Sequence, residues 1–378
     1  MRAVRPHIFE QTPETLRIAV EGLKMPAYRA DQILQWVYER HIVDPALMTN
    51  LSKWERERIA EAFAFLSGQV VRDQRATDKT RKLLVRWQDE VERAPASGSG
   101  AVSSVNLPLL AGASGSDRDT ECVMIPSEGR NTACISSQVG CPVGCRFCAS
   151  GIGGLDGNLS AGRIVEQVWL LDREVAREQE SRISNVVFMG MGEPLANYSA
   201  TVKAVRLMMG LWGLGIGGRK ITISTVGLPA AIRRLADEEL SVTLAISLHA
   251  PNDRIRRDLI PWAEFTTIEE LMSAGQYYFE RTGREVTLEY ILLGGVNDQP
   301  EHARELVEVA RTLRANVNLI RYNEVAGMPF SRPSTDDVRT FQEILRRAHV
   351  NSHIRASRGR DIAAACGQLR HEHRTAPA

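Results

Sequence analysis

The sequence predicts an α/β protein, in which a partial (β/α) barrel follows a small helical domain and a β-hairpin. Two patterns lead to this prediction. The first part of the chain spaces its apolar residues with helical periodicity, and from about residue 127 short apolar segments alternate with amphipathic helical ones. Such alternation favours a mostly parallel sheet with right-handed crossovers, and 378 residues leave room for two or three domains.

Composition narrows the class of protein. Hydrophobic residues make up 43% and charged residues 25% of the chain, which excludes collagen-like, coiled-coil and wholly disordered proteins. No apolar run approaches the roughly 20 residues that span a bilayer, and the N-terminus lacks the apolar stretch of a secretion signal. We therefore expect a cytoplasmic protein without a membrane partner. The net charge of +1 argues against coating nucleic acid along the whole surface but allows a local basic cleft.

Residues 1–75 are expected to form the helical domain. Residues 29–40 place apolar side chains at helical spacing, and a second helix is expected around 53–65 with Asn50 or Ser52 as its N-cap. We interpret this region as a small separate accessory domain.

Residues 76–126 are expected to form a β-hairpin extension. Residues 81–92 supply one arm, and a strand resumes at Glu121–Ile125. The Ala/Ser/Gly-rich stretch 94–118 between them is typical of a flexible loop.

Residues 127–365 carry the alternating pattern of the barrel core, and 366–378 follow as a C-terminal segment. The predicted strands are Thr132–Ser136, Ser184–Met189, Lys220–Ser224, Val242–Ser247, Val286–Leu292, Val317–Arg321 and Ser352–Arg355. The predicted helices between them include Ser160–Arg177, Ala200–Gly210, Glu301–Leu313 and Asp336–Ala348. A barrel of this kind carries its chemistry at the C-terminal ends of its strands.

Five of the six cysteines lie within 27 positions, which in a chain without a secretion signal favours metal or redox chemistry over disulfides. Cys141, Cys145 and Cys148 form a C-x3-C-x2-C run between a predicted strand and a predicted helix. Structural zinc wants four ligands, whereas a [4Fe–4S] cluster held by three cysteines leaves one iron open for a substrate. The alternative is a zinc site that borrows Cys134 or a distant histidine.

The cysteine run, with Phe147 before its last cysteine, is similar to that of the radical S-adenosylmethionine (SAM) superfamily. Further motifs occur in the order found in the RlmN/Cfr family of RNA adenine methyltransferases, and the resemblance covers about residues 120–370. The matching segments are Cys134–Cys141, Phe188–Leu195, Ile223–Gly227, Ser247–Asp253, Val317–Asn323 and Asp361–Gln368. The N-terminal helical region resembles the family's RNA-binding accessory domain, and the barrel is then of the radical SAM type.

The resemblance implies two cofactors. One [4Fe–4S] cluster would be bound by Cys141, Cys145 and Cys148, and two SAM molecules would be used in each turnover. The family match assigns SAM binding to Gly192, Glu193, Ser224, Ser247, Leu248, His249 and Asn323. Taken without the match, a tight βα turn is the less favoured alternative for the glycines, and His249 alone is more often a core histidine.

The resemblance also assigns the catalytic residues. An adenine amidine carbon is a poor nucleophile, so the family loads a methyl group on a cysteine thiolate before a radical activates it. Cys366 matches that methyl carrier, Cys134 matches the thiol that resolves the protein–RNA adduct as a disulfide, and Glu121 matches the proposed proton acceptor. The alternatives are buried structural cysteines and a solvated strand carboxylate, and Cys122 has no assigned role.

The implied substrate is carbon 2 of an adenosine in 23S ribosomal RNA, with transfer RNA as an additional candidate and a flavodoxin-like or other low-potential electron donor. Residues 311–378 hold twelve arginines, no lysine and six acidic residues, which suits phosphate contact around Cys366. Two alternatives stay open: the same mechanism at carbon 8, and a non-catalytic iron–sulfur or zinc RNA-binding protein.

Overall fold

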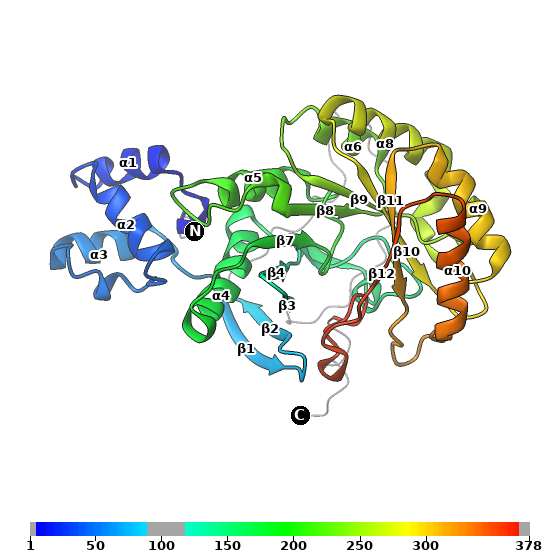
Figure 1. The fold of residues 1–378 in the computed structure, drawn as a ribbon. Helices are drawn as coiled ribbons and strands as arrows, with labels where there is room; N and C mark the ends of the chain where they lie inside the picture. The colour runs from blue at the N-terminus through cyan, green and yellow to red at the C-terminus, as the bar shows by residue number, and fades with distance from the viewer. Residues whose placement is uncertain (1–4, 89–117, 370–378) are drawn as a thin grey trace.

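A computed structural model describes residues 5–88 and 118–369 (Figure 1). The expected loop 94–118, apart from Arg118, and the end of the segment 366–378 lie outside the described residues. The centre of the molecule is a ten-stranded sheet in the order β1-β2-β3-β4-β7-β8-β9-β10-β11-β12. No helix within the described ranges is long and apolar enough to cross a bilayer.

Seven parallel strands form the partial barrel and confirm the predicted α/β fold. They are β4 (Arg130–Cys134), β7 (Asn185–Phe188), β8 (Ile221–Thr225), β9 (Thr243–Ser247), β10 (Val286–Leu292), β11 (Ala315–Arg321) and β12 (Ser352–Arg355). Within the described part of the chain β12 does not pair with β4, so the barrel stays open on one side.

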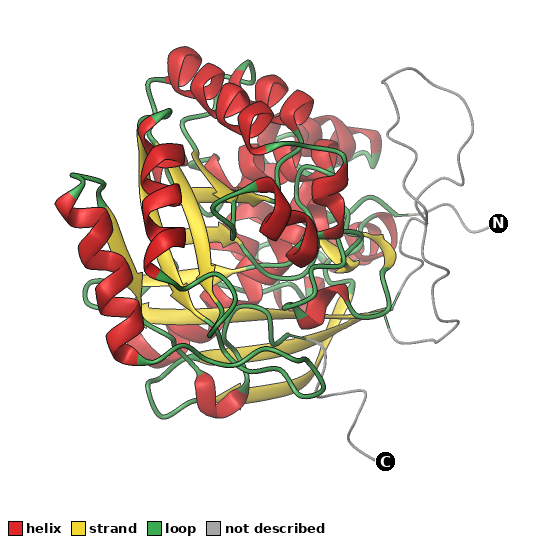
Figure 2. Ribbon diagram, turned by 90° about the vertical axis from the view of Figure 1, so that its right-hand side faces the viewer, coloured by secondary structure: helices red, strands yellow, loops and turns green. Residues whose placement is uncertain are grey.

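Helices cover the outer face of the parallel strands, as Figure 2 shows. They are α4 (Ala161–Gln179), α5 (Tyr198–Met209), α6 (Pro229–Ala236), α7 (Asp253–Leu259), α8 (Ile268–Thr282), α9 (Pro300–Arg311) and α10 (Thr335–Arg347). Each of the four predicted helices agrees with an observed one to within about two residues at either end.

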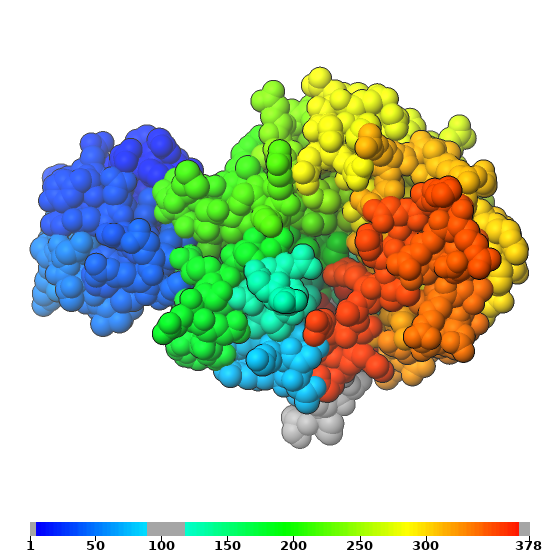
Figure 3. Space-filling view, in the orientation of Figure 1, coloured from blue at the N-terminus to red at the C-terminus, as the bar shows by residue number. Residues whose placement is uncertain are grey.

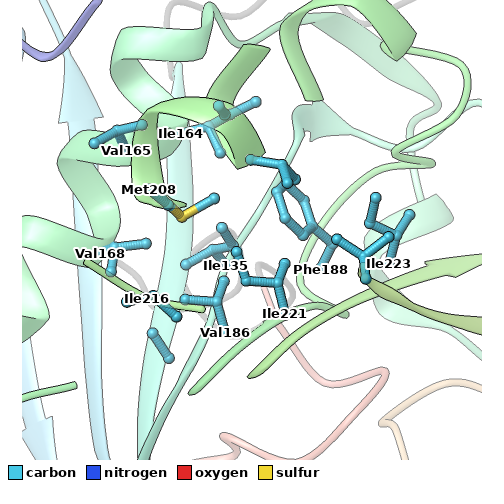
Figure 4. Close-up of a cluster of buried hydrophobic side chains, with 14 of the residues drawn as sticks. Ile135, Ile164, Val165, Val168, Val186, Phe188, Met208, Ile216, Ile221 and Ile223 are labelled. Atoms are coloured by element: carbon cyan, nitrogen blue, oxygen red, sulfur yellow. The ribbon is translucent and has the colours of Figure 1, made fainter. Parts of the chain in front are cut away.

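The main core lies between the sheet and the helices α4 and α5 (Figure 4). Isoleucine and valine side chains of β7 and β8 meet one apolar face of α4, and Phe188 closes the layer. The amphipathic periodicity of α4 therefore accounts for its position. Its apolar face packs on the sheet, and its polar face turns to solvent or to buried ion pairs.

The N-terminal helices project from one side of the barrel (Figure 3). They are α1 (Pro13–Gly22), α2 (Arg29–Tyr38) and α3 (Lys53–Ala62). Ser52 is the N-cap of α3, in a capping box with Glu55. The prediction that helices continue to residue 75 is wrong, since Gly68–Arg75 forms strand β1. This edge strand is largely exposed and polar, so it lacks the alternating apolar residues that announce a strand.

The hairpin extension joins the barrel through antiparallel pairing. Strand β1 pairs with β2 (Arg81–Trp87), β2 with β3 (Asp119–Ser127), and β3 with β4. The hairpin is therefore continuous with the central sheet, and its register decides which side chains face the barrel interior.

Glu166 of α4 connects the N-terminal domain to the barrel. Its fully buried carboxylate accepts hydrogen bonds from the Ser67 and Gly68 amides (3.0 and 2.8 Å), from the Ser67 hydroxyl (2.8 Å) and from the His7 ring (2.9 Å). We expect Glu166→Ala to lower the free energy of unfolding by about 3 kcal/mol, because several buried donors lose their partner. Urea titration checks this value against Glu61→Ala, an exposed substitution on α3 that should change stability by less than about 0.5 kcal/mol. Equal midpoints for the two variants would contradict the role given to Glu166.

Candidate active site

The three cysteines of the predicted cluster lie on a loop between two short strands. Strands β5 (Gln138–Gly140) and β6 (Leu155–Asn158) pair antiparallel and hold the ends of this loop. Val143 and Phe147 point into an apolar cluster with residues of α7, which anchors the loop from inside. The loop also touches the C-terminal segment, since the Ala149 amide donates to the Gly367 carbonyl (2.6 Å).

Cys141, Cys145 and Cys148 all line one cavity of about 150 Å³, here called the cluster cavity. Burial raises the pKa of the Cys141 thiol to about 12, and burial together with the two neighbouring thiolates raises that of Cys145. Three half-buried thiols that repel one another as thiolates suit a cation that neutralises them together. Three thiols are one donor short of a four-ligand zinc site, whereas a [4Fe–4S] cluster can be held by three cysteines. The donor set therefore fits such a cluster better than a zinc ion.

Arg256 is a buried cation near this thiol set that the sequence did not single out. Its guanidinium is fully buried and donates to the carbonyls of Val226 (2.6 Å) and Thr266 (3.2 Å). Burial lowers the pKa of Arg256 to about 10, and the charges of Cys145 and Asp253 oppose that shift. A positive charge at this place stabilises the thiolate form of Cys145.

Glu193 presents a buried carboxylate to the cluster cavity. It accepts hydrogen bonds from the amides of Val226 (2.7 Å) and Leu195 (2.9 Å), which fix its orientation. Burial raises its pKa to about 7 although these bonds oppose the shift. A carboxylate held in this way is suited to an ammonium ligand, whose charge would compensate the cost of burial.

Gly192 brings the Glu193 turn against the loop that precedes the cysteines. Its φ is +102°, and a Cβ here would lie 2.7 Å from the side chains of Ser137 and Gln138. The absent side chain thus makes room for protein rather than directly for a ligand, and the backbone of Gly192 is left lining the cavity.

Ser224, Ser247 and His249 lie on the same cavity wall, at the C-terminal ends of β8 and β9. The two serine hydroxyls are 3.2 Å apart. The Nδ1 atom of His249 accepts from the Ile291 amide (3.1 Å), so Nε2 carries the ring proton. Burial and the charge of Arg256 lower the pKa of His249 to about 3, which keeps the ring neutral.

Two of the predicted SAM-binding residues lie outside this wall. Leu248 is fully buried and lines neither this cavity nor the next one. Asn323 lines a second, larger cavity instead, and its side-chain oxygen accepts from Arg332 (2.9 Å). The structure therefore gathers Gly192, Glu193, Ser224, Ser247 and His249 around the thiols but sets these two apart.

The second cavity, here called the barrel cavity, has a volume of about 420 Å³ and occupies the half of the barrel that holds the N-terminal ends of the strands. Several strands pass from one cavity to the other. On β8, Thr222 faces the barrel cavity and Ser224 the cluster cavity, while on β10 Thr287 and Ile291 divide in the same way. The two cavities are thus stacked along the barrel axis.

Cys366 lies in the walls of both cavities. Cys134, at the end of β4, lines the barrel cavity and packs with Val123, Ala364 and Leu369. Burial and the neighbouring Cys366 thiolate raise the pKa of Cys134 to about 12. The structure therefore brings together two cysteines that are 232 positions apart in the sequence. All six cysteines are free thiols.

Strand register decides on which face of the sheet each side chain of β3 lies. Val123 pairs with Cys134, so Glu121, Val123 and Cys134 share the face that the C-terminal segment covers. Cys122 points to the opposite face, where it packs in the main core, as expected of a structural cysteine. Glu121 is buried, forms an ion pair with Lys82 (3.1 Å) and lines neither cavity.

The half-buried Arg355 and the buried Glu289 form a second ion pair that the sequence did not indicate. Arg355 lies 3.7 Å from Glu289 and lines both cavities with it. The thiolates of Cys366 and Cys134 and the Glu289 carboxylate raise the pKa of Arg355 against the effect of burial. Arg355 is therefore the cation that faces the two cysteines of the barrel cavity.

Comparison with known proteins identifies the family. The radical SAM superfamily profile matches residues 135–307, and the profile of the ribosomal RNA large subunit methyltransferase N-terminal domain matches residues 7–64. A probable dual-specificity RNA methyltransferase RlmN of Gloeobacter violaceus is 44% identical over 95% of this chain and 94% of its own length. The chain belongs to the RlmN family of radical SAM RNA methyltransferases.

Other relatives agree over nearly the whole length. The RlmN protein of Dictyoglomus turgidum is 40% identical over 94% of both chains. The ribosomal RNA large subunit methyltransferase N of Nitrosopumilus maritimus is 39% identical over 96% of this chain and 98% of its own. A radical SAM methyltransferase structure from Sphaerobacter thermophilus superposes with a TM-score of 0.87 at 40% identity, covering 97% and 99% of the two chains. RlmN membership confirms the predicted family and enzyme class, so the non-catalytic alternative is wrong. The superfamily implies an iron–sulfur cluster and SAM.

Gly192 offers a test of the cluster cavity. We expect Gly192→Ala to weaken SAM binding at least tenfold and to lower the free energy of unfolding by about 1–3 kcal/mol, because the new methyl group overlaps Ser137 and Gln138 in a left-handed backbone conformation. Calorimetric titration of cluster-reconstituted protein with SAM measures the first effect. Gly217→Ala is the matched control, since its Cβ would meet nothing within 4 Å. Normal SAM affinity in Gly192→Ala would show that the Glu193 turn does not shape the SAM site.

Proposed function

We propose that this RlmN enzyme methylates carbon 2 of an adenosine in 23S ribosomal RNA, and an adenosine of transfer RNA as its second substrate, in the cytoplasm. The observation that carries the proposal is the place of Cys366, which borders the cluster cavity on one side and the barrel cavity on the other. A methyl carrier needs both neighbours, because it must first take a methyl group from SAM and then present it to the RNA base.

In the proposed enzyme, Cys141, Cys145 and Cys148 hold a [4Fe–4S] cluster with one open iron. When bound there, the cluster and SAM supply a radical that removes hydrogen from a methyl group, with an electron from a flavodoxin-like donor. Glu193 accepts from the SAM ammonium group, and Ser224, Ser247 and the neutral His249 offer hydrogen bonds around the ligand. Leu248 and Asn323 would contribute only through shifts that bring them closer, since neither lines the cluster cavity.

Cys366 would carry the methyl group that is transferred. Each turnover would use two SAM molecules, because one donates this methyl group and the other supplies the radical that activates it. Its thiolate takes a methyl group from the first SAM by displacement. After activation of that methyl group, the carbon borne by Cys366 bonds to the adenine ring in the barrel cavity. The adduct is then covalent between protein and RNA.

Cys134 and Glu121 would resolve this adduct. The radical adduct first gives its unpaired electron to the oxidised form of the one-electron donor. The ring C–H bond then breaks, its proton goes to the Glu121 carboxylate, and the bonding pair restores the aromatic ring. The Cys134 thiolate attacks the sulfur of Cys366, and the carbon–sulfur pair goes to the carbon, which takes up a proton to become the methyl group. A Cys134–Cys366 disulfide results, and a cellular thiol reduces it before the next cycle.

The barrel cavity supports RNA as the substrate through its rim. Arg219 and Lys220 precede β8, and Arg358 follows β12, all exposed at the opening. Over residues 5–88 and 118–369 none of these three side chains forms an ion pair or a side-chain hydrogen bond, and Glu289 is the acidic residue in the cavity wall. Unpaired cations around a polar, threonine-lined cavity suit the phosphates that flank an extruded base.

Five of the ten arginines of residues 311–369 show two different placements. Arg311, Arg314 and Arg347 pair with Glu308, Glu285 and Glu343 on the outer surface, as expected of a solvated face. Arg355 and Arg358 line the barrel cavity beside Cys366. Therefore only some of the arginines in this predicted basic region lie where they could contact RNA near Cys366.

Nucleoside mass spectrometry tests the proposed reaction. We expect the reconstituted enzyme, with SAM and dithionite, to form 2-methyladenosine in unmodified 23S rRNA. Cys366→Ala should form none and carry no methyl group in intact-protein spectra, whereas Cys134→Ala should load the methyl group on Cys366 and retain the covalent protein–RNA adduct. 8-Methyladenosine as the product would overturn the assignment of the carbon, and product formation by Cys366→Ala would overturn the carrier mechanism.

The rim of the barrel cavity is tested by salt dependence. We expect Arg219→Gln with Lys220→Gln to weaken RNA binding and to reduce the slope of log K against log salt by about 1.5, since each phosphate contact contributes about 0.7–0.9. Arg304→Gln on the outer helix α9, also exposed, should leave the slope unchanged. Filter binding at several salt concentrations makes the comparison. An identical slope for the double variant and the wild type would place the RNA elsewhere.

A further inference from the structure

The hairpin extension forms hydrogen bonds with the segment that carries Cys366. The side chain of Asp78 accepts from the Gly359 amide (3.0 Å), and Asp361 accepts from the Thr77 amide (2.8 Å). Figure 1 shows the turn between β1 and β2 beside the last short helix of the chain. These contacts join residues about 280 positions apart in the sequence.

Lys82 of β2 extends this contact into the interior. Its ammonium group is buried, with the side chain 3% exposed, so its charge must be compensated by protein. It donates to the Ala363 carbonyl (3.2 Å), three residues before Cys366, and it lies 3.1 Å from the Glu121 carboxylate. One side chain thus binds both the carrier segment and the carboxylate proposed to accept the ring proton.

The register of the hairpin makes this double contact possible. Lys82 pairs with Val123, and Val123 pairs with Cys134, so Lys82, Glu121 and Cys134 all face the C-terminal segment. The opposite face carries Arg81, whose guanidinium binds Glu174 of α4 (3.0 Å). Neighbouring cations of β2 therefore serve different purposes: Arg81 attaches the hairpin to α4, and Lys82 attaches it to the carrier segment.

Glu121 needs such a link, because it lines neither cavity. Once Cys366 is bonded to the ring through its methylene carbon, the ring is tethered to residues 363–366. Whatever holds Ala363 near Glu121 then also limits how far the ring hydrogen can lie from the carboxylate. The ammonium of Lys82 additionally compensates the buried negative charge that must be present before the proton is accepted.

We propose that Lys82 is a positioning residue for the loss of the ring proton, holding the Glu121 carboxylate and the Cys366 segment in register through its contacts with Glu121 and the Ala363 carbonyl. The inference rests on the proposed function. The step itself is the one given above: after the adduct has passed its unpaired electron to the oxidised electron donor, the ring C–H bond breaks, the proton goes to Glu121 and the bonding pair returns to the ring.

Lys82→Met tests this role, because methionine keeps the length of the buried stem and removes the charge. The reconstituted holoenzyme is given SAM, dithionite and unmodified 23S rRNA transcript. We expect Lys82→Met to load the methyl group on Cys366 as the wild type does. It should release methylated adenosine at least tenfold more slowly, within the roughly 10²–10⁴-fold range of a positioned proton acceptor, and accumulate the covalent adduct on denaturing gels.

Further variants separate positioning from a purely structural effect. Lys82→Arg keeps the charge and should restore most of the product rate. Glu121→Gln should accumulate the same adduct, and combining it with Lys82→Met should slow the reaction no further, because both changes affect one step. Lys79→Met, an exposed lysine of the same hairpin turn, is the matched control and should behave as the wild type.

The outcomes distinguish the two levels of the argument. Wild-type enzyme that neither methylates Cys366 nor forms methyladenosine contradicts the proposed function itself. A working wild type with normal product and no added adduct in Lys82→Met overturns the role of Lys82. Two other results would also overturn the positioning role of Lys82: loss of Cys366 methylation in Lys82→Met, or a double variant whose rate loss is the product of the two single losses. Lys82 would then act only by holding the segment folded.

Discussion

The docking of residues 359–367 against the hairpin and the cluster loop is the contact on which the rest of the site depends. The hairpin binds this segment through Asp78, Thr77 and Lys82, and the cluster loop binds its far end through the Ala149 amide and the Gly367 carbonyl. Cys366 lies between these two attachments. Its place between the cavities is therefore set by backbone and ionic contacts from both sides, and not by the segment's own secondary structure, which is a single 3-10 turn.

Buried charge is distributed around this segment in a consistent way. Three buried or half-buried cations each face a group that is anionic or becomes so during the proposed reaction: Lys82 faces Glu121, Arg355 faces Glu289 and the two cysteines, and Arg256 faces Cys145. Isolated charges in a protein interior are costly, and such pairing offsets most of the cost. The interior can then hold thiolates and carboxylates in place without opening to solvent, which suits chemistry that water would quench.

Much of the fold could be predicted, because it depends on local periodicity. The parallel strands and the helices between them follow from apolar spacing, and strand β1 was missed because an exposed polar edge strand has no such pattern. The cysteine run and Glu193 followed from spacing and family motifs, and the structure places them around one cavity. Asn323 could not be assigned to a cavity in advance, because both cavities are lined by alternate residues of the same strands.

The sequence by itself determined the fold class, the three thiols of one short loop and the family, since these depend on periodicity and on spacing within single segments. Only the tertiary structure decided that Cys366 lies near Cys134, that Cys122 faces away, that Lys82 contacts both Glu121 and the Ala363 carbonyl, and that Arg355 lines both cavities. The reason is physical: strand register selects one face for every second residue, and Lys82 and the Ala363 carbonyl, 281 positions apart, become neighbours only when the hairpin and the C-terminal segment pack together.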